Sequence, residues 1–193
     1  QFKAQAALFP ETRNILPMLL AARRAEAWAF MQHHSCATRL LDWTASAYVG
    51  AYFAVYELAD EPGALYVVAP AALNEHAGQQ GMNRDVDDEY LTDVTLPDRV
   101  TFTYPNLGSS RLVAQQGHFS VNTNILESHD GPIVSACRAI EAQQTGKVIS
   151  RKIVIAPDLK LVVLQQLRAM NVAPHALFPG LDGLGRSLSD LAT

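Results

Sequence analysis

Apolar and polar positions along the first 70 residues predict two helices followed by a strand. From residue 17 to residue 32 apolar side chains recur at a helical spacing, which predicts an amphipathic helix. A second and largely buried helix is expected from Thr44, which stands in the N-cap position, to about residue 59. The short continuous apolar run at residues 64–68 lies between turn-forming residues and predicts a central strand.

The rest of the chain predicts further elements separated by polar stretches. Strands are expected at residues 100–104, 112–121 and 152–156, and helices at residues 157–167 and 181–191. The polar stretches 71–97, which is acidic, and 122–147 predict long loops. Because strands and helices do not alternate regularly, the pattern favours an α+β fold, with a mixed β-sheet core and flanking helices.

Composition narrows the class of protein. A chain of 193 residues with 49% hydrophobic content can bury the core of one domain of ordinary size. The net charge of −4 argues against binding nucleic acid or membrane mainly through a basic surface. Cys36 and Cys137 lie far apart, which indicates free thiols in a reducing compartment. The most apolar run, 45–59, is too short to cross a bilayer, so we expect a soluble, cytoplasmic protein with no membrane partner.

Residues 32–44, Gln-His-His-Ser-Cys-Ala-Thr-Arg-Leu-Leu-Asp-Trp-Thr, form the strongest candidate for a site. They place two imidazoles, a guanidinium, a carboxylate and an indole between two apolar helices. His33 and His34 are adjacent and point in different directions, so they cannot easily face one metal ion, and no metal is expected. The alternative to a site role is that one of these histidines is structural and the other is solvated.

The end of this segment has two interpretations. As a site, Trp43 offers a stacking surface, while Thr38, Thr44 and Arg39 offer donors to a polar ligand. As structure, Arg39 and Asp42 pair with neighbouring groups, and Asp42 or Thr44 caps the next helix. We expect Arg39 and Asp42 to be at least partly buried and hydrogen-bonded.

Gln115 and Gln116 form a second candidate, because each amide offers a donor and an acceptor to a planar polar ligand. Gly117 beside them indicates a bulge or a close backbone approach. The same run could equally be an edge strand with its polar side chains outward. If both segments are site elements, residues 38–44 and 115–119 should converge on one cleft. The acidic residues 85–89 lack the spacing of a calcium loop, and no nucleotide-binding glycine-rich loop or nucleophile elbow occurs.

Residues 32–54 resemble the FRG domain family. The family pattern is Gln-His-x-x-x-x-Thr-Arg-Leu-Leu-Asp-Trp-Thr, followed by a helix with an Ala-x-x-Phe-Ala-like centre. Blocks at 63–70, 111–119 and 152–188 resemble later family elements in the right order. Ala37 stands where the family usually has proline, and the aromatic-Arg-Gly motif is absent, although Gln1 with Leu8-Phe9-Pro10 resembles its continuation. The resemblance therefore implies a single FRG-like domain over residues 1–193 that lacks this motif.

A more distant resemblance links these blocks to the ADP-ribosyltransferase fold. It implies a cleft that binds NAD as co-substrate, with residues 38–44 and 51–54 as its middle element. The implied catalytic residues are Gln115, Gln116 and Thr38, and the implied cofactor-binding residues are His33, His34, Arg39, Asp42, Trp43, Thr44 and Phe119. That fold usually presents a glutamate where this chain has Gln115 or Gln116, and an amide cannot supply its negative charge.

Three hypotheses follow. The first is an ADP-ribosyltransferase-like domain of a toxin or defence protein, which binds NAD and modifies a protein or nucleic-acid acceptor. The second is a non-catalytic module of a larger protein, whose Trp43 pocket recognises a nucleotide, a nucleic-acid end or a peptide. The third is a structural domain with no small-molecule ligand.

Overall fold

The computed structural model describes residues 2–57, 60–79, 99–104, 109–124, 126–144 and 146–189. It is a mixed α+β structure with small β-sheets, as the sequence predicts. The chain divides into two compact units, one of residues 1–42, 70–109 and 119–143, the other of residues 43–69, 110–118 and 144–193. Each unit is described by itself.

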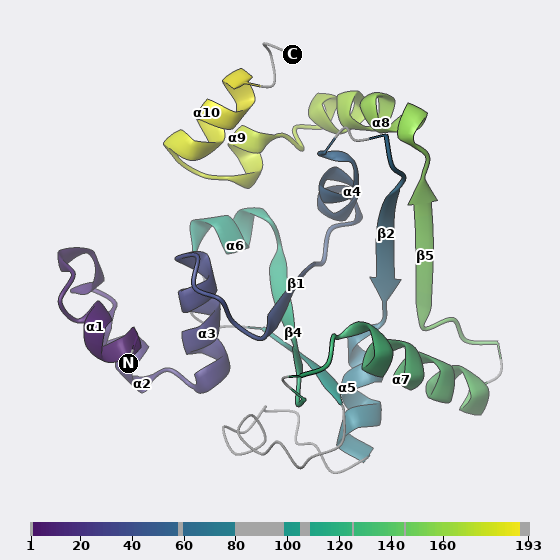
Figure 1. Cartoon of the computed structure of the whole chain (residues 1–193), viewed down its shortest axis with the longest axis horizontal. Helices are drawn as coiled ribbons and strands as arrows, with labels where there is room; N and C mark the ends of the chain where they lie inside the picture. The colour runs from purple at the N-terminus through teal and green to yellow at the C-terminus, as the bar shows by residue number, and fades with distance from the viewer. Residues whose placement is uncertain are drawn as a thin grey trace. The chain divides into compact units, whose positions relative to one another are not determined.

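Figure 1 labels the elements, and the division falls within two strands, β1 (Leu40–Thr44) and β4 (Gly117–Asn122). The first unit also holds α1 (Phe2–Ala6), η1 (Pro10–Thr12), α2 (Leu16–Ala21), α3 (Arg24–His33), α5 (Pro70–Gln79), β3 (Val100–Thr103) and α7 (Asp130–Gln143). The second holds α4 (Ala47–Val55), β2 (Gly63–Val68), α6 (Ser110–Ala114), β5 (Ser150–Ile155), α8 (Pro157–Ala169), α9 (Pro174–Leu177) and α10 (Leu181–Ser189).

Strand β4 lies between β1 and β3 in a three-stranded sheet. β3 and β4 are antiparallel, with Val100 opposite Asn122 and Thr103 opposite Phe119. Helix α5 packs against β3, where the Asn74 side chain donates to the Phe102 carbonyl at 2.9 Å and accepts from the Phe102 N–H at 2.7 Å. The alternating apolar and small polar side chains of β4 are buried on both faces, so this strand forms the centre of the sheet.

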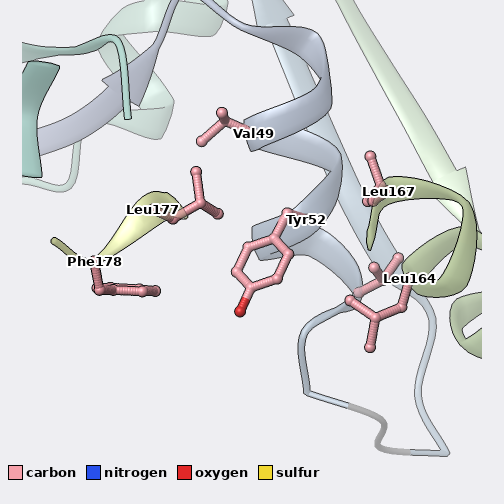
Figure 2. Packing of buried hydrophobic residues seen from close by; sticks show 7 residues of the cluster. Val49, Tyr52, Leu164, Leu167, Leu177 and Phe178 are labelled. Carbon is pink, nitrogen blue, oxygen red and sulfur yellow. The ribbon is translucent and has the colours of Figure 1, made fainter. Parts of the chain in front are cut away.

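The second unit is built around the antiparallel pair β2 and β5, in which Gly63 lies opposite Ile155 (Figure 1). Helix α4 packs against β2 and α8. Figure 2 shows Tyr52 of α4 with Leu177 and Phe178 on one side and Leu164 and Leu167 on the other. Val49 and Val55 complete this buried cluster. The cluster accounts for the apolar side chains on one side of α4, whereas Tyr48 and Phe53 of the same helix are exposed.

Several predicted elements near the N-terminus need correction. The helix predicted over residues 17–32 is two helices, because Ala22 is extended and the Glu26 carboxylate accepts from the Arg23 N–H at 3.2 Å, which begins α3. Thr44 ends β1 and does not cap α4. Ser46 is the cap, since its hydroxyl accepts from the Val49 N–H.

The predicted strand at residues 64–68 is confirmed as β2, but its central position is wrong. Among the described residues β2 pairs with β5 alone, and the side chain of Tyr66 is 57% exposed. Helix α4 ends at Val55, earlier than residue 59. The strands near residues 100 and 152 are confirmed as β3 and β5.

Helices replace parts of the predicted strand 112–121 and of both predicted loops. Residues 110–114 form α6, and a turn at Gln115 and Gln116 precedes β4. Residues 70–79 form α5, and the acidic residues 85–89 lie outside the described part of the chain. Residues 130–143 form α7, whose buried side chains Ile133, Cys137 and Ile140 recur at helical spacing within a polar stretch. Helices α8 and α10 confirm the two predicted C-terminal helices.

Candidate functional site

A depression in the first unit is the candidate site. Its volume is about 240 Å³, and it opens to solvent. The lining comes from the chain at the start of β1 and from the segment between the end of β4 and α7: Thr38, Arg39, Leu40, Leu41, Asn122, Asn124, Glu127 and His129. Six of these eight side chains are polar, and the two leucines supply apolar surface.

Arg39 fixes the start of β1 to the end of β4. One of its terminal nitrogens, Nη2, donates to the Asn122 carbonyl at 2.6 Å and also to the Thr123 carbonyl. Its guanidinium carbon lies 5.7 Å from the centre of the Trp28 ring. Burial lowers the pKa of Arg39, but a guanidinium remains charged over the whole range in which proteins fold. The predicted partial burial and hydrogen bonding of Arg39 are confirmed.

His129 connects the backbone of Arg39 to the side chain of Ser120 in β4. Its Nε2 lies 3.2 Å from the Arg39 carbonyl, and its Nδ1 lies 2.9 Å from the Ser120 hydroxyl. A carbonyl can only accept, so Nε2 carries the proton, and in the neutral ring Nδ1 accepts from Ser120. Burial is the main reason that the pKa of His129 lies below its usual value. The neutral ring is therefore the favoured form, and Ser120 is fully buried beneath it.

The Gln32 side chain forms hydrogen bonds with two residues of the segment that leads into and through β1. Its amide donates to the Asp42 carboxylate at 2.9 Å and accepts from the Thr38 hydroxyl. The Thr38 oxygen also accepts from the Leu40 N–H at 3.2 Å. Asp42 is thus hydrogen-bonded, as predicted, but its side chain is exposed, so the prediction that it is at least partly buried is wrong. One of its partners is the Gln32 amide on α3, and the carboxylate lies at the surface.

The other cofactor-binding residues predicted in the first unit do not line the depression. His33 and His34 are exposed at the end of α3, with ring centroids 5.0 Å apart, and His34 also contacts Phe30. Phe119 is buried in β4 and belongs to the core.

The remaining predicted residues lie in the second unit. The Thr44 hydroxyl donates to the Gln115 carbonyl at 2.7 Å and accepts from the Ser46 N–H at 3.0 Å. The Gln115 amide donates to the Leu177 carbonyl at 3.1 Å. Gln116 is exposed, has a φ of 48° and accepts from the Ala45 N–H, while Trp43 is half-buried. Thr44 and Gln115 are therefore brought together, and their bonds fasten this turn to its surroundings.

Gly117 makes a close approach, as the sequence indicates. A Cβ at this position would lie 2.5 Å from the Leu112 side chain of α6. The following residue, His118, is buried, and burial lowers the pKa of its imidazole.

Sequence reasoning missed four residues of the depression, namely Asn122, Asn124, Glu127 and His129. They lie at the start of the stretch interpreted as a loop. Their only signal is a high density of amide, carboxylate and imidazole groups over eight positions, which a solvated loop also shows.

Within the described residues, no three His, Cys, Asp or Glu side chains are grouped so that they could hold a metal ion. In the same part of the chain, no helix has both the length and the apolar content that crossing a bilayer requires. Cys36 and Cys137 are free thiols.

Comparison with known proteins gives one match. No curated protein and no solved structure matches the chain. A family model does match, over a segment that runs from the N-terminal helices through β1 and α4 and contains residues 32–54, the central block of the resemblance. Residues 7–62 match the FRG domain, which confirms the family resemblance over this part of the chain.

Proposed function

We propose that the chain binds a nucleotide, with NAD as the leading candidate, in the depression of the first unit. The observation that carries this proposal is the lining itself, which combines a carboxylate, two amides, an imidazole, a hydroxyl and a guanidinium with two leucines. Small-molecule sites are concave and combine apolar surface with a few placed polar groups.

The size of the depression decides which part of a nucleotide it takes. Its volume of about 240 Å³ is smaller than the roughly 300 to 1,000 Å³ of sites that enclose a whole small molecule. We therefore propose that a base or a sugar occupies the depression and that the rest of the nucleotide lies outside its open mouth.

The walls of this site are held in place by the protein. Arg39 and His129 bond to backbone carbonyls and to Ser120, so little side-chain freedom is lost when a ligand binds. Glu127 is exposed at the rim, and its carboxylate is suited to accept hydrogen bonds from ribose hydroxyls. Leu41, whose side chain is 38% exposed, offers apolar contact.

Calorimetric titration of NAD and of ADP-ribose tests the proposal. Glu127→Gln should weaken binding about tenfold, because a hydrogen bond to a charged group contributes roughly 1.5 to 3 kcal/mol. Glu75→Gln is the matched control, since Glu75 is an exposed carboxylate on α5 outside the depression. A folded parent protein that binds neither ligand, or an equal loss in both variants, would refute the proposal.

ADP-ribosyl transfer is a second candidate function, favoured by the position of Glu127. The reaction breaks the bond between nicotinamide and ribose, and positive charge develops on the sugar. A nucleophile of the acceptor, or a water molecule, then bonds to the sugar carbon and gives up its proton, while nicotinamide leaves. A carboxylate at the rim of the depression can stabilise that charge, which the amides of Gln115 and Gln116 cannot. Release of nicotinamide by the parent and its loss in Glu127→Gln would support transfer. Binding of NAD without release would instead support the non-catalytic module.

A further inference from the structure

Two arginines of the second unit contact the same aromatic ring. The guanidinium carbons of Arg111 on α6 and Arg186 on α10 lie 4.9 and 4.3 Å from the centre of the Phe178 ring. Both arginines are exposed, whereas Phe178 is 6% exposed. Within the part of the chain that the structure describes, neither guanidinium has a hydrogen bond or an ion pair.

The ring that both arginines contact is held firmly. Phe178 belongs to the buried cluster around Tyr52, and it meets the Phe53 ring edge-on, with centroids 6.2 Å apart. Its N–H donates to the Pro174 carbonyl at 2.8 Å. The position of Phe178 is therefore set by its packing in the core and by its backbone hydrogen bond.

The helices that carry the two arginines, α6 and α10, also contact residues 177 and 178. A Cβ at Gly183 would lie 1.9 Å from the Phe178 carbonyl oxygen, so α10 contacts this backbone directly, one turn before Arg186. At the end of α6, the Gln115 amide donates to the Leu177 carbonyl at 3.1 Å. Both arginines thus extend from elements anchored at residues 177 and 178, and their approach to one ring follows from the packing.

Two positive charges beside one ring repel each other, and an anion between or beside them removes that cost. Contact with the ring occupies one side of each guanidinium and leaves N–H groups to donate, in the fork geometry that matches phosphate oxygens. The chain has a net charge of −4, so this pair is a local exception to its overall charge. We propose that Arg111 and Arg186 form a binding site for the phosphate groups of a small molecule. This proposal does not depend on the depression in the first unit.

Calorimetric titration of inorganic pyrophosphate at about 0.15 M salt, where unspecific attraction is screened, tests this site. Arg111→Gln and Arg186→Gln should each weaken binding about tenfold, because each removes a charge-assisted pair of hydrogen bonds. Arg186→Lys keeps the positive charge but lacks the paired planar donors of a guanidinium, so this variant should bind pyrophosphate with intermediate affinity. Arg138→Gln is the matched control, since Arg138 is an exposed arginine on α7 in the first unit.

Each outcome decides the proposal once thermal melting shows that the variants fold. Loss of pyrophosphate binding in Arg111→Gln and Arg186→Gln, with Arg138→Gln unchanged, supports the site. An equal effect of all three variants would mean attraction to positive charge in general and would overturn it, as would a folded parent that does not bind pyrophosphate. Glu127→Gln should leave pyrophosphate binding unchanged, which separates this proposal from the one for the first unit.

Discussion

Replacing Arg39 by alanine should destabilise the first unit more than any other single change at the depression. Its guanidinium donates to the carbonyls of Asn122 and Thr123, and both of these residues are 2% exposed. The variant would therefore remove two hydrogen bonds and leave two buried carbonyls without this donor.

The magnitude follows from those two bonds. A hydrogen bond to a charged group contributes roughly 1.5 to 3 kcal/mol, so the two bonds of Arg39 together contribute roughly 3 to 6 kcal/mol, and the partial exposure of Arg39 favours the lower part of this range. We expect Arg39→Ala to lower the free energy of unfolding by about 3 to 5 kcal/mol. For a chain of this size that corresponds to a fall in Tm of roughly 6 to 20 °C. Arg39→Lys keeps the charge and one donor direction, so it should lose about 1 to 2 kcal/mol.

Urea denaturation followed by Trp28 fluorescence is the direct assay. The chain has two tryptophans, so a Trp43→Phe background leaves Trp28, which lies under Arg39, as the reporter of the first unit. Arg138→Ala is the control and should change stability by less than about 0.5 kcal/mol, as exposed substitutions usually do. If Arg39→Ala unfolds within 1 kcal/mol of that control, on the scale of these estimates, the hydrogen bonds to residues 122 and 123 do not hold the sheet as argued.

Three further predictions concern single residues. Asp42→Ala should lower the free energy of unfolding by only about 0.5 to 1.5 kcal/mol in urea denaturation, because the carboxylate is exposed and its hydrogen bond to the Gln32 amide lies at the surface. A loss above about 3 kcal/mol would show that the carboxylate is buried. Gly183→Ala should lower Tm strongly, because its Cβ would lie 1.9 Å from a backbone oxygen, whereas Gly185→Ala in the same helix meets nothing within 4 Å and should raise stability by up to about 1 kcal/mol. Equal melting of the two alanine variants would contradict this packing. Burial lowers the pKa of His129 and His118 below 6.5, so the unfolded chain binds more protons and stability should fall as pH drops through about 6.5. His129→Gln should flatten that decline in denaturation curves measured from pH 7 to 5, and an unchanged slope would place the effect elsewhere.

The sequence predicts those elements whose signal is local. β2, β5 and α8 occur within one or two residues of their predicted bounds, because a continuous apolar run marks β2, an alternating pattern marks β5 and a proline at the first helical position marks α8. Helix α7 was missed although Ile133, Cys137 and Ile140 recur at helical spacing. Polar residues occupy the other faces of α7, so its apolar stripe is narrow and the helical pattern is weak in the sequence. The structure shows that α7 packs against α5.

The candidate site likewise has features that the sequence predicts and features that depend on contacts between distant residues. The partial burial of Arg39 is predicted from the sequence, but its acceptors lie more than 80 positions away, at Asn122 and Thr123. No spacing in the sequence encodes which strands become neighbours. The roles predicted for Gln115 and Gln116 stay predictions, although the structure shows that the Gln115 amide bonds to Leu177. A side chain used for structure and one used for a ligand look alike until the partners are seen.

The paired hydrogen bonds between Asn74 and the backbone of Phe102 have a consequence for self-association. An edge strand normally presents N–H and C=O groups to any extended chain that approaches it, which is how sheets grow from one molecule into the next. At Phe102 a single amide side chain already satisfies both groups, at 2.7 and 2.9 Å, as a neighbouring strand would. Among the described strands β3 is the last of this sheet, and Asn74 on α5 occupies its outward backbone groups at Phe102. Replacement of Asn74 would leave these two groups open to an extended chain of another molecule.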